Sequence, residues 1–159
     1  MALQVSTGFK AAILGPAAFE DLFDGGVIHV YSGPQPATAD DAPTGTLLGT
    51  ISMSGAAWTP GAPAGGLRFL RNGPFVSNVP GDSWLLVPKA SGSVGWWRLV
   101  SNGEDGSGVS YELPRIDGAI GAQGANGAFE MVLKNVALTA GTAVRIQSFF
   151  YSIPPVVGI

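Results

Sequence analysis

Short runs of apolar, β-branched and aromatic residues alternate along the chain with clusters of Gly, Pro, Asn, Asp and Ser. Such runs are typical of β-strands, and the clusters are typical of turns. No repeated strand–helix alternation indicates a parallel sheet. The sequence therefore predicts an all-β fold, an antiparallel β-sandwich or jelly roll of about eight strands. The expected strands are Val27–Tyr31, Thr46–Met53, Leu67–Arg71, Trp84–Val87, Val94–Ser101, Val109–Leu113, Phe129–Leu138 and Ala143–Ser152.

The pattern is different at the N-terminus, where apolar residues recur at helical spacing between Phe9 and Phe23. Ser6 or Thr7 supplies an N-cap, and Gly15-Pro16 interrupts the helical pattern. We expect a short helix or a broken pair of helices before the first strand.

The chain of 159 residues fits one domain without an internal boundary. We divide residues 1–159 into an N-terminal helical segment (1–25), a β-sandwich (26–151) and an apolar C-terminal tail (152–159). The N-terminal stretch fits neither a signal peptide nor a membrane span. We therefore expect a protein that is made in the cytoplasm and not processed, with no membrane partner.

Composition adds that the surface is poor in charge. Only 12% of the residues are Asp, Glu, Lys or Arg, whereas 46% are hydrophobic, and soluble domains usually carry about 25% charged residues. This favours an assembly component whose surface is largely covered by other subunits. The net charge of −3 and the scattered basic residues argue against direct nucleic-acid binding. The absence of Cys excludes disulfides and thiolate metal sites.

No catalytic or cofactor-binding constellation stands out. His29 is the single histidine and lies within an expected strand, without an identifiable nucleophile or further ligands. Three adjacent acid pairs could in principle do acid–base work, but such pairs are usually solvated. We expect no enzyme activity and no cofactor. The acid pairs are Glu20-Asp21, Asp40-Asp41 and Glu104-Asp105.

One loop partly matches a calcium-binding pattern. Asp105, Gly106 and Glu112 occupy the fifth, sixth and twelfth places of such a loop, but Ser101 and Gly103 stand where ligands should be. We expect an acidic hairpin tip and no metal site.

Two adjacent aromatic pairs, Trp96-Trp97 and Phe149-Phe150, are expected in strands. Neighbouring strand residues point to opposite faces, so one ring of each pair faces away from the core. A second layer of the same domain or another subunit must cover that ring, and the low charge favours another subunit.

Two further segments are predicted to lack regular secondary structure. Gly118, Gly121, Gly124 and Gly127 form too few Gly-x-y triplets for a collagen-like stalk, which indicates a loop. The tail from Ser152 is apolar and interrupted by Pro154-Pro155, so we expect it to lie against a neighbouring surface.

The run GVIHVYSGPQPATADDAPTGTLLGTI from Gly26 to Ile51, preceded by STGFKAAIL from Ser6 to Leu14, resembles the N-terminal third of small virion structural proteins of tailed bacteriophages. Beyond this part, the resemblance is only in character. It implies a structural role in the virion, most like a capsid decoration (cement) protein at the capsid surface. The implied partners are the major capsid protein and copies of this chain in a homo-oligomer.

The Ser32–Gly45 loop is expected to reach across a capsomer seam. The other expected contact residues are apolar. They are Phe9, Ile13, Trp96, Trp97, Phe149, Phe150, Pro154, Pro155 and Ile159.

Two alternative functions stay open: a tail, baseplate or fibre-attachment component, and a carbohydrate-binding module using outward Trp rings. A host-surface glycan is a conceivable partner, but no residue pattern supports it.

Overall fold

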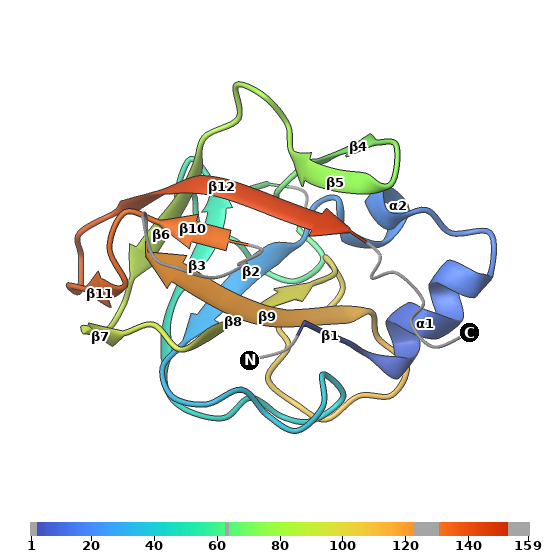
Figure 1. Cartoon of the computed structure of the whole chain (residues 1–159), viewed down its shortest axis with the longest axis horizontal. Helices are drawn as coiled ribbons and strands as arrows, with labels where there is room; N and C mark the ends of the chain where they lie inside the picture. The colour runs from blue at the N-terminus through green and yellow to red at the C-terminus, as the bar shows by residue number, and fades with distance from the viewer. Residues whose placement is uncertain (1–2, 63, 123–130, 153–159) are drawn as a thin grey trace.

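The computed structural model describes residues 3–62, 64–122 and 131–152. Two helices near the N-terminus lie at one end of a strongly curved set of strands (Figure 1). The helices are α1 (Thr7–Leu14) and α2 (Phe19–Phe23). The strands are β1 (Gln4–Val5), β2 (Val27–Tyr31), β3 (Leu47–Met53), β4 (Phe69–Asn72), β5 (Phe75–Asn78), β6 (Trp84–Pro88), β7 (Gly92–Ser93), β8 (Trp96–Val100), β9 (Arg115–Ala122), β10 (Met131–Leu133), β11 (Ala137–Leu138) and β12 (Val144–Ser152).

The two helices confirm the predicted broken pair. Ser6 is the N-cap of α1, and its hydroxyl accepts a hydrogen bond from the backbone N–H of Phe9 at 3.1 Å. Gly15 ends the first helix, as its position before Pro16 predicts. In α2 the Asp21 carboxylate accepts a hydrogen bond from the backbone N–H of Ala18 at 3.0 Å, which stabilises the start of this short helix.

Seven strands close into a β-barrel. Their order around the barrel is β9-β8-β2-β3-β6-β12-β10, and β10 returns to pair with β9. All neighbouring pairs are antiparallel except β9 and β10. The short strand β10 closes the barrel because it forms hydrogen bonds with β12 on one side and β9 on the other.

The all-β prediction is confirmed, but the predicted sandwich or jelly roll is wrong. A sandwich has two separate sheets, whereas β10 joins β9 to β12 here and so closes one sheet on itself. The inward–outward alternation of side chains is the same in a sandwich and in a barrel. The hydrophobic pattern alone therefore cannot distinguish these two architectures.

Most expected strands are present, and β2 has the predicted bounds. Val109–Leu113 is a loop instead, so the predicted hairpin turn after β8 is longer than expected. The strand β9 occupies the glycine-containing stretch that was expected to be a loop, including Gly118 and Gly121. Gly124 and Gly127 lie outside the described residues. The strand β5 is not among the strands expected from the sequence.

Close packing explains the glycine in the middle of β9. A Cβ atom at Gly118 would lie 2.4 Å from Cζ2 of Trp97 on the adjacent strand β8. The Trp97 indole N–H donates a hydrogen bond to the carbonyl of Ala119 at 2.9 Å. Gly118 therefore leaves the space in which the indole ring lies against β9.

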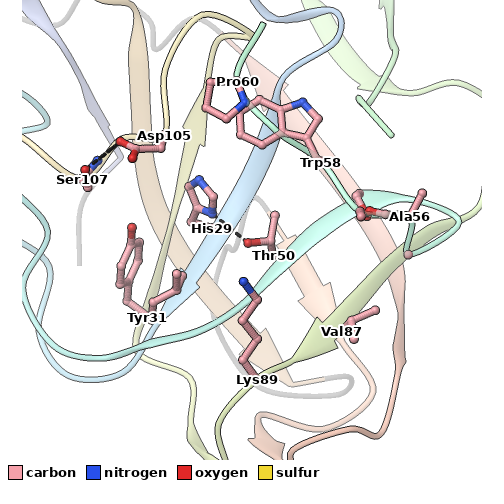
Figure 2. A pocket seen from close by; sticks show the side chains of 14 residues that line it. His29, Tyr31, Thr50, Ala56, Trp58, Pro60, Val87, Lys89, Asp105 and Ser107 are labelled. Atoms are coloured by element: carbon pink, nitrogen blue, oxygen red, sulfur yellow. Dashed lines mark hydrogen bonds between the residues drawn. The ribbon is translucent and has the colours of Figure 1, made fainter. Parts of the chain in front are cut away.

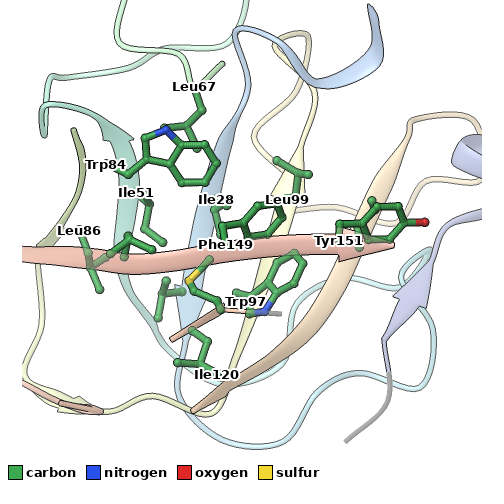
Figure 3. Close-up of a cluster of buried hydrophobic side chains, with 14 of the residues drawn as sticks. Ile28, Ile51, Leu67, Trp84, Leu86, Trp97, Leu99, Ile120, Phe149 and Tyr151 are labelled. Carbon is green, nitrogen blue, oxygen red and sulfur yellow. The ribbon is translucent and has the colours of Figure 1, made fainter. Parts of the chain in front are cut away.

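Large apolar side chains fill the barrel interior (Figure 3). Phe149 is near the centre, and its ring centroid lies 5.5 Å from those of both Trp84 and Trp97. Aliphatic side chains from the surrounding strands complete this core, which excludes water and drives folding through apolar burial. They include Ile28, Ile51, Leu86, Leu99, Ile116 and Ile120.

The helices cover one end of this core with aromatic rings. Phe9 from α1 lies 5.8 Å from Phe23 of α2, measured between ring centroids, and Phe19 lies 5.3 Å from both Phe69 and Tyr151. The rings connect the N-terminal segment to β4 and to the end of β12. The helical segment is thus part of the same packed unit as the barrel.

Candidate functional site

The structure divides the predicted contact residues into buried, half-buried and exposed groups. Trp97 and Phe149 lie inside the barrel, and Phe9 lies in the aromatic end cluster. Ile13 is half-buried against the core, whereas Phe150 is 46% exposed. The buried side chains form the core, so within this fold they present no contact surface. Pro154, Pro155 and Ile159 lie outside the described residues.

Trp96 has no exposed surface although it points away from the barrel interior. Its ring stacks on Tyr31 with centroids 4.5 Å apart, and the guanidinium carbon of Arg98 lies 5.4 Å from the ring centroid. The loops at residues 32–46 and 101–114 cover this layer. A second layer of the same domain, and not another subunit, therefore buries the outward tryptophan.

Two buried arginines connect these loops to the barrel. Arg98 forms a bidentate ion pair with Asp117 at 2.7 and 2.8 Å, and both side chains have no exposed surface. The same guanidinium donates hydrogen bonds to the carbonyls of Asp41 and Gly106, one in each loop. The Ser32–Gly45 loop, expected to reach across a capsomer seam, thus folds onto its own barrel.

Arg115 holds the loop at residues 101–114 in the same way. Its guanidinium binds both oxygens of Glu104 at 2.8 and 2.6 Å and donates to the carbonyl of Gly108 at 2.7 Å. Because buried charges are tolerated only when paired and hydrogen-bonded, these contacts fix the loop. For Asp117, burial raises the carboxyl pKa, while the hydrogen bonds and charge of Arg98 oppose that rise.

The expected acid pairs are used in local structure. Asp40 accepts hydrogen bonds from the backbone N–H and hydroxyl of Thr7 at 2.8 and 2.7 Å. Asp41 accepts the backbone N–H of Thr38, and Glu104 binds Arg115. Each of these carboxylates is thus engaged in a hydrogen bond or ion pair within the fold.

A row of outward side chains crosses five adjacent barrel strands. Strand register places Asp117, Arg98, His29, Thr50 and Val87 side by side on β9, β8, β2, β3 and β6. The loops cover the end of this row at β9 and β8. At the other end of the row, His29, Thr50 and Val87 help to line a groove of about 530 Å³ over β3 and β6 (Figure 2).

The groove combines aromatic, apolar and charged side chains from distant parts of the chain. Figure 2 shows Trp58 and Pro60 on one side and Lys89 on the other, with His29 and Thr50 between them. Tyr31, Leu47, Val87 and Asp105 also line the groove. Such a mixture of an apolar surface and a few polar groups is typical of small-molecule sites.

His29 lies at the floor of the groove and is 6% exposed. Its Nδ1 forms a 2.9 Å hydrogen bond with the Thr50 hydroxyl. Its Nε2 is buried and makes no hydrogen bond of good geometry to the described residues. The carboxylate and the backbone of Asp105 lie close enough to favour protonation of the imidazole. Burial dominates and lowers the pKa of His29 to about 4, so the imidazole is neutral at pH 7.

The groove walls are held by hydrogen bonds to the backbone and between loop side chains. The Trp58 indole N–H donates to the carbonyl of Gly25 at 2.9 Å, which fixes the ring. Oδ1 of Asp105 accepts hydrogen bonds from the backbone N–H and the hydroxyl of Ser107 at 3.0 and 2.7 Å. These two hydrogen bonds lower the pKa of the Asp105 carboxyl and keep it charged.

A separate apolar surface covers the outer face of β4, β5 and β12. Leu70 and Phe150 both pair with Ser77, so all three side chains point to the same face of these strands. The Phe75 and Phe150 ring centroids are 4.8 Å apart, and Leu70, Phe75 and Phe150 are each more than 40% exposed. We call these three residues the Phe150 surface.

Strand alternation predicts that one ring of the Phe149-Phe150 pair faces outward, but it selects neither ring and gives no sign of the neighbouring residues. Leu70 lies in an expected strand that the structure places at a sheet edge, and Phe75 lies in the missed strand β5. The groove was also missed, because Trp58, Lys89 and Asp105 belong to segments that come together only through the barrel topology. The presence of His29 in a strand was the only sequence signal for it.

No helix in the described part of the chain is both long enough and apolar enough to span a membrane. No group of three or more His, Asp or Glu side chains in residues 3–62, 64–122 and 131–152 is arranged to hold a metal ion.

Comparison of the chain with protein-family models, with curated proteins and with solved structures found no match.

Proposed function

We propose that this chain is a non-enzymatic structural subunit of a tailed-phage virion. In this role it decorates the capsid shell and binds the major capsid protein and further copies of itself through the Phe150 surface. The proposal combines the resemblance of the Gly26–Ile51 region with the physical character of the folded surface.

The observation that carries the proposal is the exposure of two contacting aromatic rings beside Leu70. Phe75 and Phe150 are 42% and 46% exposed, although moving an aromatic side chain out of water lowers the free energy. Exposed apolar patches of this kind commonly mark protein interfaces, and aromatic residues often dominate their binding energy. The Phe150 surface therefore supports a role in assembly.

The chain is also suited to many simultaneous weak contacts. The buried ion pairs Arg98–Asp117 and Arg115–Glu104 satisfy charges internally, and only 12% of the residues are charged, so little charge needs to be desolvated on binding. When many copies bind one shell, each contact can be weak while the whole layer stays attached. Stabilisation of the shell then comes from the number of copies.

A binding experiment with Phe150→Ala tests this proposal. Shells purified without this chain are mixed with the wild-type protein or the variant, and bound protein is measured by co-sedimentation. Loss of an interface aromatic should lower the affinity about tenfold or more. Tyr111→Ala is the matched control, because Tyr111 is 64% exposed on the loop between β8 and β9.

Near-UV circular dichroism checks that both variants retain the packed barrel. Equal binding of wild type and Phe150→Ala would overturn the Phe150 surface as the contact site. Failure of the wild-type protein to bind shells would overturn the decoration role itself.

A further inference from the structure

The groove over β3 and β6 has no part in the proposed assembly contacts. It lies on the outer face of the row that contains His29 and Thr50, whereas the Phe150 surface lies on β4, β5 and β12. From its shape and its polar groups, we propose that the groove is a binding site for a neutral saccharide.

The apolar part of the groove suits the carbon face of a sugar ring. The Trp58 N–H is already used by the Gly25 carbonyl, so the indole can offer a ligand only its ring surface. Val87 and Leu47 on β6 and β3 add apolar area, each being 37% exposed. An aromatic ring held rigidly in this way binds an apolar face at a low cost in conformational entropy.

The polar part of the groove suits hydroxyl groups. Asp105 uses Oδ1 for Ser107, and its Oδ2 makes no hydrogen bond to the described residues, so it can accept from a ligand. Lys89 has no ion-pair partner among the described residues and can donate. A hydroxyl both donates and accepts, so a polyhydroxylated ligand satisfies both groups at once.

The balance of charge favours a neutral ligand. Lys89 and Asp105 contribute one charge of each sign, and the buried His29 adds none. A phosphate or sulfate would meet the Asp105 carboxylate, and a cationic ligand would meet Lys89, so like charges oppose both. A neutral sugar avoids both repulsions.

The size of the groove fits the same conclusion. Its volume of about 530 Å³ lies within the range of sites for small organic ligands, which is about 300–1,000 Å³. The groove is partly open to solvent, so a longer oligosaccharide can continue beyond it. His29 and Thr50 support the floor through their mutual hydrogen bond.

A glycan array carrying neutral, sialylated and sulfated glycans is the first probe. The strongest ligand is then titrated in solution by tryptophan fluorescence against wild type, Asp105→Ala, Lys89→Ala and Phe150→Ala. We expect saturable binding of a neutral glycan. Loss of a charge-assisted hydrogen bond should weaken binding about tenfold or more for Asp105→Ala and Lys89→Ala, whereas Phe150→Ala should leave it unchanged.

Absence of saturable binding to any neutral glycan would overturn the saccharide site. Preference for sialylated or sulfated glycans would overturn the neutral ligand class. Equal affinity of wild type and both groove variants would overturn the location. None of these outcomes bears on shell binding, which depends on the Phe150 surface and is measured separately.

Discussion

Individual buried charges determine how the loops of this protein are held. Arg98 and Arg115 each combine a bidentate carboxylate contact with hydrogen bonds to loop carbonyls. A sequence gives no signal for such contacts, because Arg98 reaches the Asp41 carbonyl across 57 positions of the chain. Alternation placed Trp96 and Trp97 on opposite faces, but only these long-range contacts show that the chain's own loops bury Trp96.

The Arg98–Asp117 pair predicts a large effect from a small substitution. Asp117→Asn leaves the Arg98 charge without its partner in a site with no exposed surface, and it should lower the free energy of unfolding by about 3–5 kcal/mol. Urea denaturation measures this change. The matched control is Asp82→Asn, which breaks the ion pair with Arg68; this arginine is exposed, so solvent screens the pair and the loss should be much smaller. Equal losses in the two variants would contradict this account.

His29 predicts a dependence of stability on pH. The unfolded chain binds a proton near the ordinary pKa of 6.5, whereas burial lowers the pKa of His29 in the folded protein to about 4. The unfolded state therefore binds more protons between these values, and stability falls as the pH drops from about 6.5 to 4. The whole shift amounts to about 3 kcal/mol.

Comparison with His29→Gln isolates this contribution, because Asp105, Lys89 and Arg98, which surround His29, are common to both proteins. The difference in unfolding free energy, wild type minus variant, should rise with pH between 4 and 6.5 and stay constant above 7. A difference that does not change with pH would contradict the buried neutral imidazole.

At the level of elements, the glycine-containing strand β9 shows why strand prediction was incomplete. Glycine is disfavoured in strands, yet Gly118 is needed where Trp97 packs against β9. In contrast, Val109–Leu113 has strand-like residues but lies in the loop anchored by Arg115. Local preference therefore predicted β2 correctly, whereas packing and loop contacts decided these two segments.

Gly118→Ala tests the packing argument. The added Cβ would lie 2.4 Å from the Trp97 ring, so the ring or β9 must move, and overpacking of this kind costs about 1–3 kcal/mol. The matched control is Gly103→Ala, because an added Cβ there meets nothing within 4 Å. Urea denaturation and the near-UV spectrum of the tryptophans measure the effect. A Gly118→Ala protein as stable as the control would contradict the close approach.

For the whole molecule, the closed barrel separates two surfaces with different chemistry. The Phe150 surface is apolar and lies on strands that extend beyond the barrel, while the groove over β3 and β6 is mixed and charge-balanced. The low charge of the composition predicts a surface covered by other subunits, but composition alone carries no information on position. The position of the Phe150 surface depends on β5, which pairs with the end of β12.

A cryo-EM reconstruction of the particle that carries this chain is the most direct test of the proposed capsid decoration. We expect copies of the barrel at repeated positions over the icosahedral shell, with Phe75 and Phe150 covered by the major capsid protein or by a neighbouring copy. Density confined to the tail axis, or a shell layer in which the Phe150 surface faces solvent, would contradict it.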